Sequence, residues 1–489
     1  MAAAALGAAA GQVLALLVNP AAAPVIAVGA AIVDRVPTPL KEWAIASFGT
    51  ADKAVLLGTV VFGVVVIAAV AGILASRRPA FGYGLFIAVG VVGGIAAATR
   101  PAAGQLDWSP SLVGTVVAIL VLRLELRWLA SRPGTEAGSA KGIDRRVLLT
   151  GAAGVVAASA TAAVSGGLIG TAPAAPVELP TPATPGPTLP AGLEATVPGI
   201  SPLRTPIDVF YRIDTALILP QVSPSTWTLQ VDGMVAAPFR LTWAELLAMP
   251  VIERDITLTC VSNEIGGPYC GSTRFTGVPV ADLLRRARPD PSADQVLSSS
   301  VDGFSASTPL AVLLDGRDAM IAIAMDGQPL TPAHGFPARL VTPGLYGYVG
   351  ATKWLSRLKV TTFAADEAYW TQRGWGELGP VKTACRIDTP INRVAAGTAV
   401  IGGVAWATHR GVGKVEVQVD SGPWVAAKLG PDVGLDYWRQ WYLPWEATSG
   451  QHRLAARAYD ASGMPQVADV QGVLPDGATG YHIVQVNVG

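Results

Sequence analysis

The sequence predicts a multi-domain chain, with an α-helical membrane region, then an α+β domain, then a β-sandwich. Hydrophobic residues make up 51% of the 489 residues and charged residues only 14%. The mean hydropathy of +0.43 is high for a chain without membrane segments. Long apolar runs lie before residue 171, whereas short alternating runs separated by turn residues follow residue 207.

Charge and cysteine content exclude several classes of function. The 35 basic and 35 acidic residues cancel, so nothing in the charge favours a nucleic-acid partner. Residues 1–170 carry 12 basic and 7 acidic residues, which leaves the rest of the chain net negative. Three cysteines exclude a disulfide-rich scaffold and a four-cysteine metal site.

Residues 1–170 form the predicted membrane region. Each apolar run is about 20 residues long, enough to cross the hydrocarbon core of a bilayer. The first is the weakest, because Asn19, Pro20 and Pro24 interrupt it. The five predicted spans cover 11–33, 54–76, 81–99, 108–130 and 147–170.

The distribution of basic residues predicts the orientation of these spans. Four basic residues fall on one side, at Arg35, Lys41, Lys53 and Arg100, and eight fall on the other. The side with more Lys and Arg is expected to be cytoplasmic. Five spans then place the N-terminus inside and everything after residue 170 outside, at the cell membrane with membrane lipid as a partner.

A short motif before the fifth span agrees with export. The sequence Asp-Arg-Arg-Val-Leu-Leu at 144–149 resembles a twin-arginine export signal, although an ordinary pair of cytoplasmic arginines explains it equally well. All four histidines lie beyond residue 330, so no span offers a histidine ligand to haem or copper. This region is therefore predicted to be an anchor, and the alternative of an electron-transfer subunit is disfavoured.

The remaining chain divides into a Pro-rich linker at 171–207, an α+β domain at 208–385 and a β-sandwich at 386–489. The linker composition favours extended, semi-rigid conformations. In the α+β domain we expect strands at 227–231 and 256–260 and helices at 242–247 and 280–287, the first helix with a capping box from Thr242 and Glu245.

Cys260 is the first candidate for chemistry. The sequence contains no nucleophile elbow, Walker loop, His-Glu-x-x-His or Cys-x-x-Cys motif. Cys260 ends a predicted strand beside a loop rich in glycine, and a thiolate suits a heavy transition metal held mainly by an organic chelator. The alternative is a buried cysteine that packs as a small hydrophobe. That alternative is favoured for Cys270 and Cys385, and the sequence leaves open whether those two form a disulfide.

His334, Arg339 and Lys353 form a second candidate, because these basic residues lie among glycines that let backbone amides approach an anion. The alternative is a structural turn with solvated basic side chains.

Five motifs in order carry a resemblance to the sulfite oxidase family, over roughly residues 205–475: 257–263, 303–310, 325–330, 334–339 and 353–354. The resemblance implies a molybdenum–molybdopterin cofactor and oxygen-atom transfer. It also implies that 386–489 is an immunoglobulin-like domain through which a homodimer forms.

The resemblance also implies roles for individual residues. Cys260 is implied to ligate molybdenum, and Arg212 to face the metal as a catalytic residue. The remaining implied positions hold the pterin or its phosphate, and they are Phe210, Tyr211, Arg212, Ile213, Asp214, Asn263, Asp302, His334, Arg339, Ala351, Thr352 and Lys353.

We therefore expect a membrane-anchored extracytoplasmic molybdopterin oxidoreductase that acts on a small molecule, sulfite or an S- or N-oxide, and uses a separate electron-transfer protein. Glu264 and Ile265 stand where sulfite oxidases carry arginines, which leaves the substrate open. The competing interpretation is a non-catalytic, membrane-tethered interaction module that keeps the fold without the cofactor.

Overall fold

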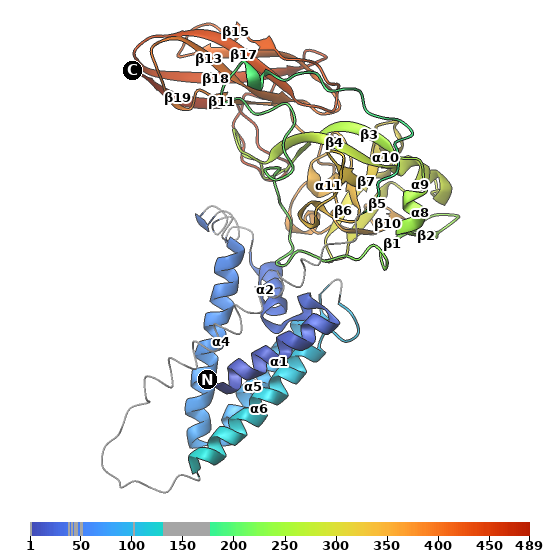
Figure 1. Ribbon diagram of the computed structural model, residues 1–489, viewed down its shortest axis with the longest axis vertical. Coiled ribbons are helices and arrows are strands. Elements are labelled where there is room, and N and C mark those ends of the chain that lie inside the picture. The colour runs from blue at the N-terminus through green and yellow to red at the C-terminus, as the bar shows by residue number, and fades with distance from the viewer. Residues whose placement is uncertain are drawn as a thin grey trace. The chain divides into compact units, whose positions relative to one another are not determined.

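The computed structural model describes residues 2–37, 40, 43, 47–48, 52–100, 103–130 and 177–489. These form two compact units (Figure 1). The N-terminal unit lies before residue 177 and includes 216–219, and the C-terminal unit contains 177–215 and 220–489. Each unit is described by itself below.

The N-terminal unit is helical. Three of its helices are long and apolar enough to cross a membrane, over Lys53–Arg77, Pro79–Ala98 and Ser109–Trp128. They match the second, third and fourth predicted spans. The helices are α1 (Ala2–Val18), α2 (Pro24–Arg35), α4 (Asp52–Arg77), α5 (Pro79–Ala98) and α6 (Ser109–Ala130).

The first predicted span, 11–33, is wrong as a single helix. Helix α1 ends at Val18, and the 3₁₀ turn Pro20–Ala22 separates it from α2. The Asn19 side chain accepts a hydrogen bond from the Ala21 amide at 3.1 Å, and Pro20 lacks the amide that would continue α1. The predicted fifth span and the twin-arginine motif lie outside the described residues, so the total of five spans is untested.

The sequence predicts an extended linker at 171–207. Residues 177–207 instead belong to the C-terminal unit and bond to its two domains. The Ala183 amide donates to Val251 O at 2.9 Å, and the Leu193 amide donates to Gln440 Oε1 at 2.7 Å. Val197 and Leu203 are buried. The segment therefore forms backbone hydrogen bonds to both domains that follow it, which composition alone does not indicate.

The domain after this segment is built on one mixed sheet, in which only β1 and β10 pair in parallel, and one antiparallel sheet. One has the strand order β2-β1-β10-β5-β6, and the other has the order β3-β4-β7-β8, with β9 paired to β7. The strands of the first sheet are β1 (Thr228–Gly233), β2 (Phe239–Thr242), β5 (Gln295–Ser300), β6 (Ser305–Pro309) and β10 (Leu355–Thr361). Those of the second are β3 (Ile252–Thr259), β4 (Cys270–Pro279), β7 (Met320–Met325), β8 (Gln328–Pro329) and β9 (Arg339–Val341).

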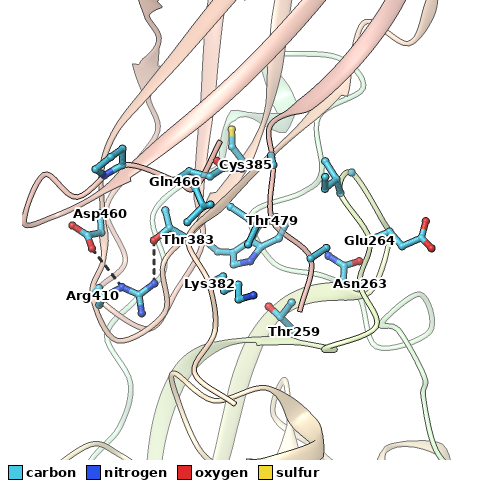
Figure 2. A pocket seen from close by; sticks show the side chains of 18 of the residues that line it. Thr259, Asn263, Glu264, Lys382, Thr383, Cys385, Arg410, Asp460, Gln466 and Thr479 are labelled. Carbon is cyan, nitrogen blue, oxygen red and sulfur yellow. Dashed lines mark hydrogen bonds and ion pairs between the residues drawn. The ribbon is translucent and has the colours of Figure 1, made fainter. Parts of the chain in front are cut away.

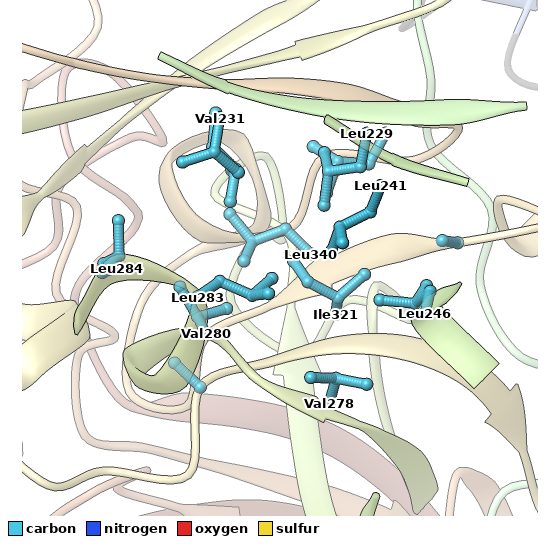
Figure 3. Packing of buried hydrophobic residues seen from close by; sticks show 14 of the residues in the cluster. Leu229, Val231, Leu241, Leu246, Val278, Val280, Leu283, Leu284, Ile321 and Leu340 are labelled. Carbon is cyan, nitrogen blue, oxygen red and sulfur yellow. The ribbon is translucent and has the colours of Figure 1, made fainter. Parts of the chain in front are cut away.

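A shared apolar core joins these sheets and the helices beside them (Figure 3). Leu229 and Val231 of β1 pack with Ile321 of β7 and Leu340 of β9, and all four are fully buried. The domain's helices are α8 (Trp243–Leu247), α9 (Val280–Ala287), α10 (Leu310–Leu314) and α11 (Gly347–Gly350). The predicted capping box is confirmed, because the Thr242 and Glu245 side chains each bond the other's backbone amide.

The last domain is a sandwich of two sheets around a common core. One sheet has the order β11-β13-β17-β16 and the other β12-β19-β18-β14-β15, and only β12 and β19 pair in parallel. Its strands are β11 (Ala384–Thr389), β12 (Asn392–Val394), β13 (Gly397–Trp406), β14 (Val412–Val419), β15 (Val425–Ala426), β16 (Lys428–Leu429), β17 (Arg439–Ala447), β18 (Gly450–Asp460) and β19 (His482–Val488). The predicted β-sandwich therefore forms, starting two residues before the predicted boundary.

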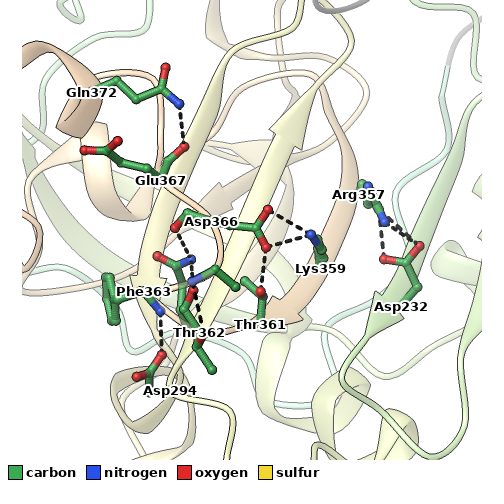
Figure 4. Close-up of polar contacts among 12 residues, drawn as sticks. Asp232, Asp294, Arg357, Lys359, Thr361, Thr362, Phe363, Asp366, Glu367 and Gln372 are labelled. Atoms are coloured by element: carbon green, nitrogen blue, oxygen red, sulfur yellow. Dashed lines mark hydrogen bonds and ion pairs between the residues drawn. The ribbon is translucent and has the colours of Figure 1, made fainter.

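Polar contacts fix the chain that leaves β10 (Figure 4). The Asp366 carboxylate accepts hydrogen bonds from Lys359 Nζ at 2.6 Å and from Thr361 Oγ1 at 2.5 Å. These bonds lower the pKa of Asp366. The Phe363 amide donates to Asp294 Oδ1 at 2.8 Å. The segment after β10 is thereby tied back to its own strand and to the loop before β5.

We expect Asp366→Asn to lower the melting temperature by about 2–4 °C at pH 7, because the substitution weakens partly exposed ionic hydrogen bonds worth about 1 kcal/mol. A depressed carboxyl pKa stabilises the fold above the unfolded value of about 3.9, and the contribution is lost as the pH falls through the lower folded value. The difference from wild type should therefore shrink below about pH 4. Tryptophan fluorescence during heating measures it, and Asp282→Asn, which removes an exposed pair with Arg285, should shift melting by less than about 1 °C.

Candidate active site

Cys260 directly follows β3, in the loop that connects β3 to β4. The two strands are antiparallel, with Thr259 opposite Cys270. The Cys260 amide donates to Tyr269 O at 2.9 Å, and the Asn263 side-chain oxygen accepts from the Tyr269 amide at 2.8 Å. The loop is thus fixed by its own backbone and by Asn263, which holds the cysteine in place rather than leaving it on a free segment.

The Cys260 thiol is half-buried and lies 2.9 Å from the Ser262 hydroxyl. Burial raises its pKa, while hydrogen bonds from Ser262 and the charge of Lys353 act in the opposite direction. Because its pKa is raised, the group is a protonated thiol at pH 7, and a bound metal ion would displace the proton. Cys260, Cys270 and Cys385 are all free thiols, so the disulfide that the sequence left open does not form.

Arg339, at the start of β9, is a buried guanidinium whose charge no carboxylate balances within the described residues. Its side chain donates to His334 O at 3.3 Å and to Ala351 O at 3.4 Å, and its Nε atom has no partner. Burial lowers its pKa to about 10. A buried, uncompensated cation is costly, and an anion bound beside it would relieve that cost. The donor set therefore fits a phosphate-bearing group.

Lys353 lies beside this arginine and is held by Asp214. Lys353 Nζ donates to Asp214 Oδ2 at 2.8 Å and to Ala333 O at 3.1 Å, and Arg212 Nε reaches the same carboxylate at 2.8 Å. Burial lowers the pKa of Lys353 to about 8, although the Asp214 carboxylate opposes the shift. Asp214 therefore positions two of the predicted cations, and its own charge would not attract a phosphate.

His334 ends the 3₁₀ turn Pro332–His334 and lies on the same side as these cations. Its Nε2 is 3.1 Å from Ile207 O and therefore donates a proton to it. Burial and the charge of Arg339 lower the pKa of His334 to about 4, so the ring is neutral at pH 7. Phe210 meets the His334 ring edge-on at 5.8 Å and stacks on Tyr211 at 5.3 Å, which brings the 210–214 segment to the site.

The other predicted site residues form contacts within the protein or are exposed. The Asp302 carboxylate accepts from the Phe304 amide at 3.1 Å and so caps its own turn. The Thr352 hydroxyl pairs with the Ser298 hydroxyl at 2.7 Å inside the fold. Ala351 contributes its carbonyl to Arg339, while the Ile213 side chain is exposed. The role of each toward a cofactor stays a prediction.

Sequence reasoning missed two features of this region. The hydroxyl of Ser262, two residues after Cys260, lies 2.9 Å from the thiol. A hydroxyl side chain so close to the cysteine in sequence could have indicated this contact. A cavity beside the Cys260 loop is lined in part by β-sandwich residues, and no sequence pattern connects those residues to the cysteine.

Part of the C-terminal unit is similar to known proteins. Residues 216–370 match the family model described as an oxidoreductase molybdopterin-binding domain. The chain is 32% identical to NADH nitrate reductase 1 of Oryza sativa subsp. japonica over 178 residues, covering 31% of this chain and 19% of that protein. It is 28% identical to mitochondrial sulfite oxidase of Homo sapiens over 301 residues, covering 51% of this chain and 54% of that protein.

A solved structure shows the same fold. The crystal structure of the sulfane dehydrogenase SoxCD from Paracoccus pantotrophus matches with a TM-score of 0.51 and 22% identity, over 58% of this chain and 83% of that chain. The chain spans about half of human sulfite oxidase and about a fifth of the rice nitrate reductase.

Proposed function

The chain carries a molybdopterin-binding oxidoreductase domain of the sulfite oxidase family, and from this premise we propose a membrane-anchored, extracytoplasmic enzyme that transfers oxygen atoms at a molybdenum ligated by Cys260. One observation carries the proposal. A thiol at a strand end and a buried arginine, whose charge is unbalanced in the described chain, both lie near enough to Tyr211 to shift its pKa. Together they offer a metal ligand and an anion site.

Several of the predicted site residues would hold the cofactor. The bound cofactor supplies two-electron oxo exchange with the substrate. Arg339 and Lys353 would hold its phosphate by charge-assisted hydrogen bonds, with Asp214 keeping Lys353 oriented. Neutral His334, Tyr211 and Phe210 would border the pterin, and Arg212 lies at the exposed edge where a substrate would arrive.

We expect Cys260→Ala to lose turnover by at least about a thousandfold and to lose most of its molybdenum, because the protein's only proposed metal ligand is removed. Elemental mass spectrometry on detergent-purified protein from a host that makes the cofactor gives molybdenum per chain. Cys385→Ala, which removes a thiol from the sandwich core, should keep wild-type molybdenum. Well-folded wild-type protein without molybdenum or pterin would instead favour the non-catalytic interaction module.

The proposed location follows from the apolar helices and the distribution of basic residues. Protease added to spheroplasts of a bacterial host should cleave the C-terminal unit and leave a membrane-protected N-terminal fragment. Changing both Arg145 and Arg146 to Lys should leave the C-terminal unit protected inside the cell if the twin-arginine motif directs export. Changing Arg123 and Arg127 to Lys is the matched control, and protection of the wild-type unit would contradict the orientation.

Two partners complete the proposal. Two-electron chemistry at one metal requires an external donor or acceptor, so we propose a separate electron-transfer protein. The sandwich over 386–489 is proposed, by its family resemblance, as an immunoglobulin-like surface for a homodimer.

A further inference from the structure

The loop that carries Cys260 needs contacts outside itself to keep one shape. Residues 260–269 connect β3 to β4 without a helix or strand, and they include the adjacent glycines Gly266 and Gly267. Gly266 has a φ of +76°, a conformation that favours glycine. Glycine loses the most conformational freedom on folding, whereas a metal ligand must be held to within about 0.5 Å.

Arg386, in strand β11 of the sandwich, bonds this loop directly. Its Nη1 donates to Gly267 O at 2.9 Å. Its Nε donates to Asp388 Oδ1 at 2.6 Å, and its Nη2 donates to Ser201 Oγ at 2.8 Å. The Ser201 amide donates to Asp388 Oδ2 at 2.9 Å. Because the guanidinium is bonded in three directions and its side chain is 12% exposed, its orientation is fixed.

His482, at the start of β19, packs against the same loop. Its Nδ1 accepts a hydrogen bond from the Ile387 amide at 2.9 Å, so the ring is neutral and Nε2 bears the proton. A Cβ atom on Gly266 would clash with His482 Nε2. The ring therefore lies directly on the backbone of the loop.

Contacts within the loop connect its held part to the cysteine. A Cβ atom on Gly267 would lie 2.7 Å from Asn263 Oδ1, so these two residues are in close contact. The same oxygen accepts from the Tyr269 amide, and the Tyr269 carbonyl accepts from the Cys260 amide. The contacts thus continue from the carbonyl that Arg386 holds to the backbone of Cys260.

A cavity of about 350 Å³ lies at the same junction (Figure 2). Asn263 and Glu264 line it from the Cys260 loop, and Cys385, which directly precedes Arg386, lines it from β11. Because a cavity offers no packing contacts on its empty side, the loop depends here on directional bonds.

We propose that Arg386 is a positioning residue for the proposed metal ligand, and that it acts by holding the Gly267 carbonyl. The β-sandwich then completes the active site, because it fixes the loop from which Cys260 reaches the metal. The inference rests on the proposed function, which assigns Cys260 to molybdenum.

The first test measures the thiols of full-length, molybdenum-free protein in detergent. Alkylation with N-ethylmaleimide, followed by peptide mass spectrometry, gives a separate rate for each cysteine. We expect Arg386→Met to raise the Cys260 rate about tenfold, because losing a hydrogen bond from a charged donor lets the loop open. The rates of Cys270 and Cys385, which are buried, should stay within about twofold of wild type.

Arg457→Met is the matched control. Arg457 is another sandwich arginine, it pairs with Glu416 at 2.7 Å, and its side chain is 23% exposed. Its loss should leave the Cys260 rate unchanged. Arg386→Lys takes the place of Arg386→Met if that variant does not fold, and the same rise is expected because an ammonium lacks the rigid fork of donors.

Gly266→Ala tests the loop from the side of His482. The added Cβ should push the loop off the ring and raise the Cys260 rate at least about fivefold. Gly374 has a similar φ of +87°, but nothing lies within 4 Å of the position that a Cβ would take. Gly374→Ala should therefore share the backbone strain and leave the Cys260 rate unchanged.

A second readout uses molybdenum-loaded protein. After partial reduction with dithionite, Arg386→Met should show a shifted or broadened Mo(V) electron paramagnetic resonance signal, because its sulfur ligand is held less uniformly. Arg457→Met should show the wild-type signal.

The outcomes separate this inference from the proposed function. Faster alkylation of Cys260 alone supports the hold of Arg386 on the loop even if wild-type protein never binds molybdenum, where the proposed function fails. In protein that does load molybdenum, an unchanged Cys260 rate or an unchanged Mo(V) signal in Arg386→Met overturns the inference alone. An equal rise at all three cysteines, or the same rise in Arg457→Met, would show a general loss of stability and also overturns it.

Discussion

Replacing Arg339 with methionine is expected to reduce molybdenum and pterin content to a tenth of wild type or less. The guanidinium is buried, its Nε has no partner, and no carboxylate balances it within the described residues. Charge-assisted hydrogen bonds to a phosphate are worth about 3 kcal/mol, which is about a hundredfold in affinity. Elemental mass spectrometry and the fluorescence of the oxidised pterin measure the two contents.

The melting temperature of cofactor-free protein distinguishes an anion-binding arginine from a structural one. Removing an uncompensated buried charge should leave the melting temperature of the Arg339→Met apoprotein unchanged or higher. Arg357→Met is the matched control, because Arg357 pairs with Asp232 at 2.8 Å and should keep wild-type cofactor content. A large drop in apoprotein melting with normal cofactor content in Arg339→Met would contradict an anion-binding role.

Gly335→Ala is expected to remove cofactor through crowding rather than through charge. Gly335 has a φ of +105°, and a Cβ atom there would lie 3.0 Å from Lys353 Cβ and 3.1 Å from Arg339 Cβ. The two cations would have to move apart, so we expect cofactor content below about a tenth of wild type. Backbone strain should also cost about 1–2 kcal/mol, measured as a lower melting temperature.

Gly316→Ala separates these two effects. Gly316 has a similar φ of +96°, but nothing lies within 4 Å of the position that a Cβ would take. Its alanine variant should therefore melt lower by a comparable amount and keep its cofactor. If both variants lost cofactor equally, general destabilisation would explain the loss and the specific role of Gly335 would be wrong.

Local features of this protein were predictable because they depend on residues close in sequence. The capping box of Thr242 and Glu245 joins residues three apart, and α9 has the bounds 280–287 that the sequence predicts. The apolar runs that became α4, α5 and α6 stand out by composition alone. Asn19 and Pro20 also indicate a helix break in the sequence. The span at 11–33 was nevertheless predicted as continuous because the apolar run is long enough to cross a membrane.

The sequence by itself determined the order of the three parts, the strand end that presents Cys260, and the basic residues near 334–353. Only the tertiary structure decided which of those basic side chains pair with a carboxylate and which do not. Asp214 neutralises Lys353 from 139 positions away, while Arg339 has no carboxylate partner in the described chain. Asp476 neutralises Lys382 across 94 positions. Charge pairing depends on distance in space, and the fold brings these residues together through sheet pairing that no local pattern encodes.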